Sequence, residues 1–250
     1  MEVFNITLPT NWAELSDEQL HMVYSLFARD LSAAEVKTLC LMKWNGLKVL
    51  SQLPDKRFLI KREKEEVILS TRQIQQASSV LDYLDSFAPM PVRISKIGRH
   101  KALPADFEKV PFEQFLFVEN LFQGYLNTQS DELLLQMAQV LYASDHVKPD
   151  KAQLVGIFYW MASLKQYFAG LFSNFYKPAG ANSDGNLLGG GQSDLYSQLR
   201  DSTNAMIRAL TGGDITKEAA IMKMDTWRAL TELDAKAREA EEIRKATKQS

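Results

Sequence analysis

Leu15-Ser16-Asp17-Glu18-Gln19-Leu20 carries a helix-start signal that returns at Leu31-Ser32-Ala33-Ala34-Glu35-Val36 and at Leu69-Ser70-Thr71-Arg72-Gln73-Ile74. In each segment a serine stands three residues before a Gln or Glu. This is the spacing of a capping box, in which the two residues satisfy each other's backbone N–H groups. The apolar residue before each serine can also close on the apolar residue four after it, as a hydrophobic staple. The three segments therefore predict three helices in the first third of the chain.

Between the second and third signals the periodicity changes from that of a helix to that of strands. Short β-like runs lie at 47–53, 57–62 and 66–69, and they are separated by Pro54-Asp55 and by Glu63-Lys64-Glu65. Short runs with turn residues between them are typical of antiparallel strands. We therefore predict a mainly α fold of the α+β type, a helical protein with a small antiparallel β-meander in the N-terminal third.

Helical periodicity dominates the remainder of the chain. It predicts helices at 71–87, 111–127 and 131–142, an aromatic helix opened by Pro149, and helical segments after 194. Gly, Asn and Ser are frequent before the last of these, which is typical of a linker. The expected parts are a helix-helix-meander-helix unit (1–105), a central helical body (106–177), a flexible Gly-rich linker (178–193) and a C-terminal helical segment (194–250). Whether these parts form one core or two is left open.

The composition is that of a globular protein whose net charge does not attract polyanions. Of the 250 residues 46% are hydrophobic, and 29 Lys and Arg against 31 Asp and Glu leave a net charge of -2. Neither nucleic acid nor an anionic membrane is attracted by such a balance. The single cysteine, Cys40, lies in an apolar run and is expected to be a small buried hydrophobe. With no secretion signal at the N-terminus, we expect a cytoplasmic protein.

The aromatic segment 154–176 is long enough to raise the question of a membrane span. Lys165 and Gln166 would then lie near the bilayer centre, where a lysine costs roughly 3 kcal/mol. We therefore expect a buried central helix and no membrane association.

The densest group of basic residues lies in the proline-rich loop at 89–104. It could bind an anion, bind the acidic surface of a partner, or remain solvated, and it consists of Arg93, Lys96, Arg99, His100 and Lys101. An active site would need a pocket around Arg99-His100 or Asp145-His146, but a loop at the end of a helix is the simpler interpretation of the second pair. No histidine has the spacing of a metal ligand, and Gly189-Gly190-Gly191 lacks the Lys-Ser/Thr of a phosphate loop. We expect no catalytic residue, no metal site and no cofactor.

Nucleic-acid binding is the alternative that the order of the first elements raises, because two helices followed by a hairpin also occur in winged helix-turn-helix domains. The second helix would contact the bases, yet Lys37 and Lys43 are its only basic residues. The hairpin is richer in Lys and Arg, but Glu63, Glu65 and Glu66 nearly neutralise them. The sequence does not favour nucleic acid as the partner.

The C-terminal segment carries an apolar stripe at spacings of three and four residues. Such a stripe either folds back on the protein's own core or binds another protein chain, and the sequence favours the first at least as much as the second. The candidate contacts for a partner are Ile221, Met224, Trp227, Leu230, Leu233 and Ala237.

Two runs in the same segment carry a resemblance. Asp201-Ser202-Thr203-Asn204-Ala205-Met206-Ile207-Arg208-Ala209-Leu210-Thr211-Gly212-Gly213-Asp214-Ile215-Thr216-Lys217 and Met224-Asp225-Thr226-Trp227-Arg228-Ala229-Leu230-Thr231-Glu232-Leu233-Asp234 resemble uncharacterised proteins of tailed-phage and prophage tail gene clusters. Such clusters encode the tail assembly chaperone, a small helical protein that keeps the tape-measure protein soluble before the tube polymerises. The length of this chain and its β-meander depart from that pattern.

Together these observations predict a non-enzymatic interaction or assembly protein. The resemblance implies a tail assembly chaperone in the host-cell cytoplasm, with a tape-measure or tail tube protein as its partner. The alternatives are a virion structural component and a winged-helix-like nucleic-acid-binding protein. The oligomeric state is left open.

Overall fold

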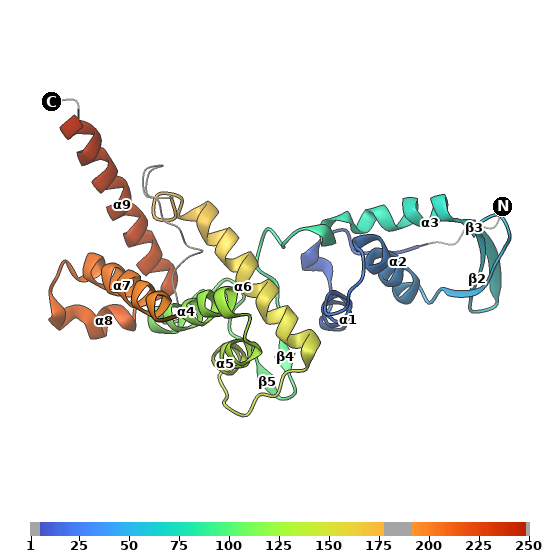
Figure 1. The fold of residues 1–250 in the computed structure, drawn as a ribbon, viewed down its shortest axis with the longest axis horizontal. Helices are drawn as coiled ribbons and strands as arrows, with labels where there is room; N and C mark the ends of the chain where they lie inside the picture. The colour runs from blue at the N-terminus through green and yellow to red at the C-terminus, as the bar shows by residue number, and fades with distance from the viewer. Residues whose placement is uncertain (1–5, 178–191, 249–250) are drawn as a thin grey trace.

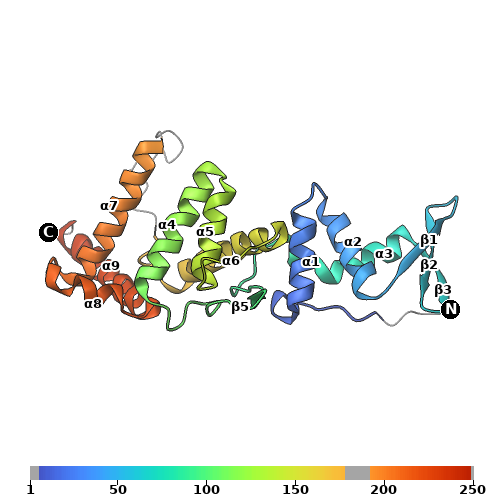
Figure 2. The ribbon, with the colours of Figure 1, turned by 90° about the horizontal axis from the view of Figure 1, so that it is seen from below.

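The computed structural model describes residues 6–177 and 192–248, and the chain is mainly helical with a small antiparallel sheet in its N-terminal third, as predicted. Figure 1 shows an elongated molecule, with the sheet and the first helices at one end and the C-terminal helices at the other. The long helix α6 (Lys151–Leu171) runs between them, and Figure 2 shows the same arrangement from below.

All three predicted capping boxes form. At the second, the Glu35 N–H donates to Ser32 Oγ at 3.3 Å and the Ser32 N–H donates to Glu35 Oε2 at 2.8 Å. Each box therefore satisfies N–H groups that a helix start leaves open. The three helices that they begin are α1 (Asp17–Phe27), α2 (Ala33–Trp44) and α3 (Thr71–Ser78).

The predicted meander is a three-stranded antiparallel sheet in the order β1-β2-β3. Its strands are β1 (Lys48–Gln52), β2 (Arg57–Arg62) and β3 (Glu65–Ser70). One face packs through the fully buried Ile60 on Leu41 of α2 and Ile74 of α3. On strands β2 and β3, Leu59 pairs with Ile68.

The single helix predicted at 71–87 is two elements. After α3 the chain tightens into the 3-10 helix η2 (Ser79–Asp85). Ser78 Oγ donates to the Gln75 carbonyl and Ser79 Oγ donates to the Gln76 carbonyl. Hydroxyls that bond to a preceding carbonyl compete with the backbone bonds of an α-helix, and these two serines stand where α3 passes into η2.

Two further short elements lie outside the predicted helices and strands. The arm before the first helix contains the 3-10 helix η1 (Trp12–Glu14), whose Trp12 Nε1 donates to the Tyr83 carbonyl at 3.0 Å. The proline-rich loop at 89–104 contains a short hairpin of the two-residue strands β4 (Lys96–Ile97) and β5 (His100–Lys101).

Two cores meet on α6. The N-terminal core gathers Trp12, Tyr24 and Leu81, and receives Ala152, Val155 and Tyr159 from the first turns of α6. The second core receives Ile157, Trp160, Met161, Leu164 and Phe168 from the same helix. The aromatic helix therefore belongs to both units.

Two antiparallel helices build the second core with α6. They are α4 (Phe112–Thr128) and α5 (Asp131–Leu141), close to their predicted bounds. Lys165 of α6 forms an ion pair with Glu119 of α4, which gives this charge a partner in a largely apolar helix. No helix among the described residues is long and apolar enough to cross a bilayer.

The C-terminal segment joins the second core and does not form a core of its own. Ala229, Leu230 and Leu233 are buried with α4 and α6. Of the predicted linker, 178–191 lie outside the described residues, and its last two residues begin a helix. The C-terminal elements are α7 (Gln192–Thr211), the 3-10 helix η3 (Ile215–Lys217), α8 (Glu218–Met222) and α9 (Thr226–Lys248).

Candidate functional site

The apolar stripe that holds the candidate contacts for a partner lies against the protein's own core. Ile221, Leu230 and Leu233 are buried in it, and Met224 and Trp227 pack on it while partly exposed. Ala237 follows one turn beyond Leu233 and is also partly exposed. Folding back, the first of the two possibilities for this segment, is therefore what the structure shows, because the broad apolar end of the stripe fills space beside α4 and α6.

Hydrogen bonds fix this segment to the loop before α4. Thr226 donates to the Val110 carbonyl through its N–H at 2.9 Å and its Oγ1 at 2.7 Å. The Phe112 N–H donates to the Met224 carbonyl at 2.8 Å, and Trp227 Nε1 donates to the Asp106 carbonyl at 2.7 Å. The run 224–234 is therefore held by these bonds against the loop before α4.

The basic cluster of the proline-rich loop divides in two. Arg93 is partly buried, with its Nε donating to the Leu103 carbonyl at 2.5 Å and its guanidinium over the Trp160 ring at 5.9 Å. It therefore does not join the surface patch predicted for it. Lys96 and Lys101 face each other across the β4–β5 hairpin, with Arg99 in its turn and His100 partly buried on β5. These four residues share one small hairpin.

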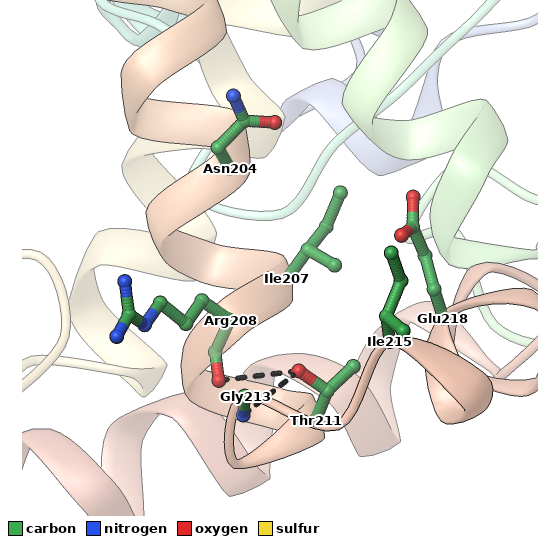
Figure 3. A pocket seen from close by; sticks show the side chains of 7 residues that line it. All are labelled: Asn204, Ile207, Arg208, Thr211, Gly213, Ile215 and Glu218. Atoms are coloured by element: carbon green, nitrogen blue, oxygen red, sulfur yellow. Dashed lines mark hydrogen bonds between the residues drawn. The ribbon is translucent and has the colours of Figure 1, made fainter.

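A hollow lies between α7 and the segment that contains η3 and α8 (Figure 3). Its volume is about 470 Å³, and Asn204, Ile207, Arg208, Thr211, Gly213, Ile215 and Glu218 line it. We call it the α7 hollow. Ile207 points from α7 into the hollow, Ile215 and Glu218 stand across from it, and the Arg208 side chain extends away from them. Ile215 is 79% exposed, more than any other large apolar side chain that the structure describes.

The turn that follows α7 shapes this hollow. Gly212 and Gly213 have φ of 65° and 86°, a region in which side chains other than glycine are strained. Thr211 Oγ1 donates to the Arg208 carbonyl at 3.3 Å and accepts the Gly213 N–H at 3.2 Å. The chain therefore reverses sharply and brings Ile215 back opposite α7.

The comparisons with known proteins give no relative. No protein-family model, curated protein or solved structure matches this chain. The chemistry of the hollow and of the ionisable groups is therefore the basis for a functional proposal.

Ionisable groups with shifted pKa values lie mainly in the cores and at helix ends. Burial raises the pKa of the Cys40 thiol to about 12, as expected for a small buried hydrophobe. Arg99-His100 lies on the β4–β5 hairpin, and Asp145-His146 is exposed in the loop between α5 and α6. Among the described residues, no three His, Cys, Asp or Glu side chains are grouped as metal ligands.

The hairpin considered for nucleic-acid binding has carboxylates beside its basic side chains. Arg57 Nε lies 2.5 Å from Asp55 Oδ2, and Lys61 Nζ lies 3.9 Å from Glu66 Oε1. Both pairs are about half exposed, so they leave the local charge close to balanced.

The residues of the α7 hollow were not predicted as a site. One local signal marks them: Ile215 is an isolated apolar residue between Gly212-Gly213-Asp214 and Thr216-Lys217-Glu218. A lone isoleucine in a polar turn does not belong to an apolar helical stripe, so its side chain is expected to be exposed. That Ile207 faces it across a recess depends on the tight turn and on the docking of α8.

Proposed function

We propose that this protein is a non-enzymatic interaction protein that binds another protein chain at the α7 hollow. The observation that supports it is that Ile215 is 79% exposed beside a hollow into which Ile207 points. Apolar surface in a recess with a polar rim is typical of protein interaction sites. Covering Ile215 with a partner would remove most of its apolar area from water, which favours association.

The partner that the resemblance implies is a tail protein. The first run carrying it, 201–217, supplies six of the seven residues that line the hollow. We therefore propose an assembly chaperone that holds a tape-measure or tail tube protein in the host cytoplasm. A virion structural component would use the same surface and differ by remaining in the finished particle.

Two matched isoleucines test the proposed surface. Ile215 on the hollow and Ile243 on α9 are 79% and 67% exposed, so an aspartate at either position leaves the cores intact. The tagged full-length chain should retain a tape-measure or tube protein from its native cells, as identified by mass spectrometry. Ile215→Asp should lose that protein and Ile243→Asp should keep it.

Retention by the Ile215→Asp chain would refute the hollow as the binding surface. Recovery of a protein unrelated to tails would refute the chaperone assignment. Mass spectrometry of purified virions separates the two tail roles, because a chaperone is absent from the particle and a structural component is present.

A further inference from the structure

The α7 hollow continues along α7 into a second, more apolar one. The second hollow has a volume of about 360 Å³ and lies between α4, α5 and the first half of α7. Asn204 lines both. The α7 residues of the two hollows recur at helical spacing on one face of that helix, and they are Leu199, Arg200, Thr203, Asn204, Ile207, Arg208 and Thr211.

The length of this face sets the size of what fits beside it. From Leu199 to Thr211 the helix advances by 12 residue steps, or about 18 Å at 1.5 Å per step. We call the two hollows together the α7 groove. The opposite wall is formed by α4 and α5 at one end and by η3 and α8 at the other.

The floor of the groove is apolar in each hollow and polar at Asn204, where the two hollows join. Phe117 of α4 is 53% exposed at one end, and Ile215 is exposed at the other. Leu121, Leu133, Leu199 and Ile207 lie between them and are partly buried. The Asn120 side-chain amide donates to Thr203 Oγ1 at 3.4 Å, which ties α4 to α7 beside this floor.

Charge is distributed unequally between the two walls. Arg200 and Arg208 stand eight residues apart on α7, and Glu218 stands on the wall of α8. Arg200 Nε lies 3.6 Å from its neighbour Asp201 in an exposed pair, which leaves the guanidinium open to a further carboxylate. Within residues 6–177 and 192–248, neither Arg208 nor Glu218 is paired with an opposite charge.

We infer that the occupant of the α7 groove is an amphipathic α-helix of about three turns on the partner chain, with carboxylates along the edge that faces Arg200 and Arg208. Its apolar side chains recur every three or four residues, and a Lys or Arg faces Glu218. The inference rests on the proposed function and specifies the chemistry of the partner. The walls offer no open strand edge with which an extended segment could pair, and a helix seated in such a groove satisfies its own backbone.

A photo-reactive side chain in the groove identifies the occupant directly. Benzoylphenylalanine replaces Asn204 in the tagged full-length chain, and Ser202, exposed on another face of α7, is the control position. After irradiation of the native cells, the peptide cross-linked at 204 but not at 202 is sequenced. We expect a segment of another protein with an apolar helical stripe and Asp or Glu along one edge.

Charge reversal then tests the electrostatic match with that segment as a synthetic peptide. The double variant Arg200→Glu with Arg208→Glu should bind it at least about tenfold more weakly than the parent chain in fluorescence anisotropy. A peptide with its acidic edge changed to lysine should show the reverse preference, which a misfolded variant would not show. Equal affinities in all four combinations would overturn the inferred charge pattern.

The outcomes of the cross-linking separate the inference from the proposed function. A captured segment that is extended, basic or without an apolar stripe overturns the inferred helix and leaves the binding surface standing. Capture of a second copy of this chain, or of nothing beyond the Ser202 control, overturns both.

Discussion

Gly156 lies where α6 crosses α1, and its missing side chain is what allows the two helices to touch. A Cβ at this position would stand 2.8 Å and 2.9 Å from two ring carbons of Tyr24. The ring is fully buried and is surrounded by Trp12, Phe27 and Tyr159, so it has no free direction in which to move. A glycine inside a helix normally costs stability, and here the close packing of the two helices offsets that cost.

We predict opposite effects of the same substitution at two glycines of α6. Gly156→Ala should lower the free energy of unfolding by about 1–3 kcal/mol, because overpacking at Tyr24 outweighs the gain in helix propensity. Gly170→Ala, which meets nothing within 4 Å, should raise it by roughly 0.5–1 kcal/mol. Urea unfolding of both variants measures the difference, and a stabilised Gly156→Ala chain would contradict the packing argument.

Sequence patterns predicted the positions of individual helices and strands better than any other feature of the structure. Capping boxes, strand-turn spacing and apolar periodicity placed the starts of α1 and α2, and both ends of the three strands, α4 and α5, close to where the structure has them. These signals act within a few residues, and tertiary contacts do not need to be known to interpret them. The sequence missed elements whose conformation depends on contacts between distant residues. One is η1, where Trp12 Nε1 donates to the Tyr83 carbonyl.

The docking of α9 depends on a carboxylate that no pattern singled out. Asp234 Oδ1 accepts the N–H groups of Asn174 and Phe175 at 2.8 Å and 3.0 Å, and Oδ2 accepts the Asn174 amide at 2.9 Å. Burial of Asp234 disfavours its charged form, but these hydrogen bonds outweigh it and hold the pKa below its ordinary value of 3.8. The charged carboxylate therefore caps the loop after α6.

We predict that Asp234→Asn destabilises the protein by about 1–2 kcal/mol at neutral pH, because a charged acceptor is replaced by a neutral one. A lowered pKa contributes stability above the unfolded-state pKa, near 4, and this contribution is lost as the pH falls through the folded-state pKa. The difference between parent and variant should therefore be constant from pH 7 to 5 and shrink below pH 4. Urea titrations across this range measure it, and a constant difference down to pH 3 would contradict the assignment.

At the scale of the whole molecule, α6 contributes side chains to both cores and so couples their packing. Ala152, Val155 and Tyr159 lie in the N-terminal core, and Ile157, Trp160, Met161, Leu164 and Phe168 lie in the second. His21 Nε2 of α1 also lies 2.8 Å from Asp150 Oδ2, the N-cap of α6. Neither core can lose its packing without exposing part of the same helix.

We predict a single cooperative unfolding transition for both cores. In native-state hydrogen exchange, the most protected amides of α1 and of α4 should open with the same free energy, because α6 couples them. The exposed last turn of α9 serves as a reference for local fraying. A lower opening free energy for α1 than for α4 would show that the N-terminal unit unfolds alone.

The sequence by itself determined the class of fold and most of its elements, because capping, turns and periodicity are interactions between residues a few positions apart. It could not distinguish a stripe that binds a partner from one that folds back, since both have the same apolar spacing. Tertiary structure alone decided that Leu230 and Leu233 fill the second core, that Arg93 leaves its cluster for Trp160, and that Ile215 faces Ile207 across a groove. These outcomes depend on contacts between residues far apart in the chain, where shape and burial, and not local pattern, select the neighbour.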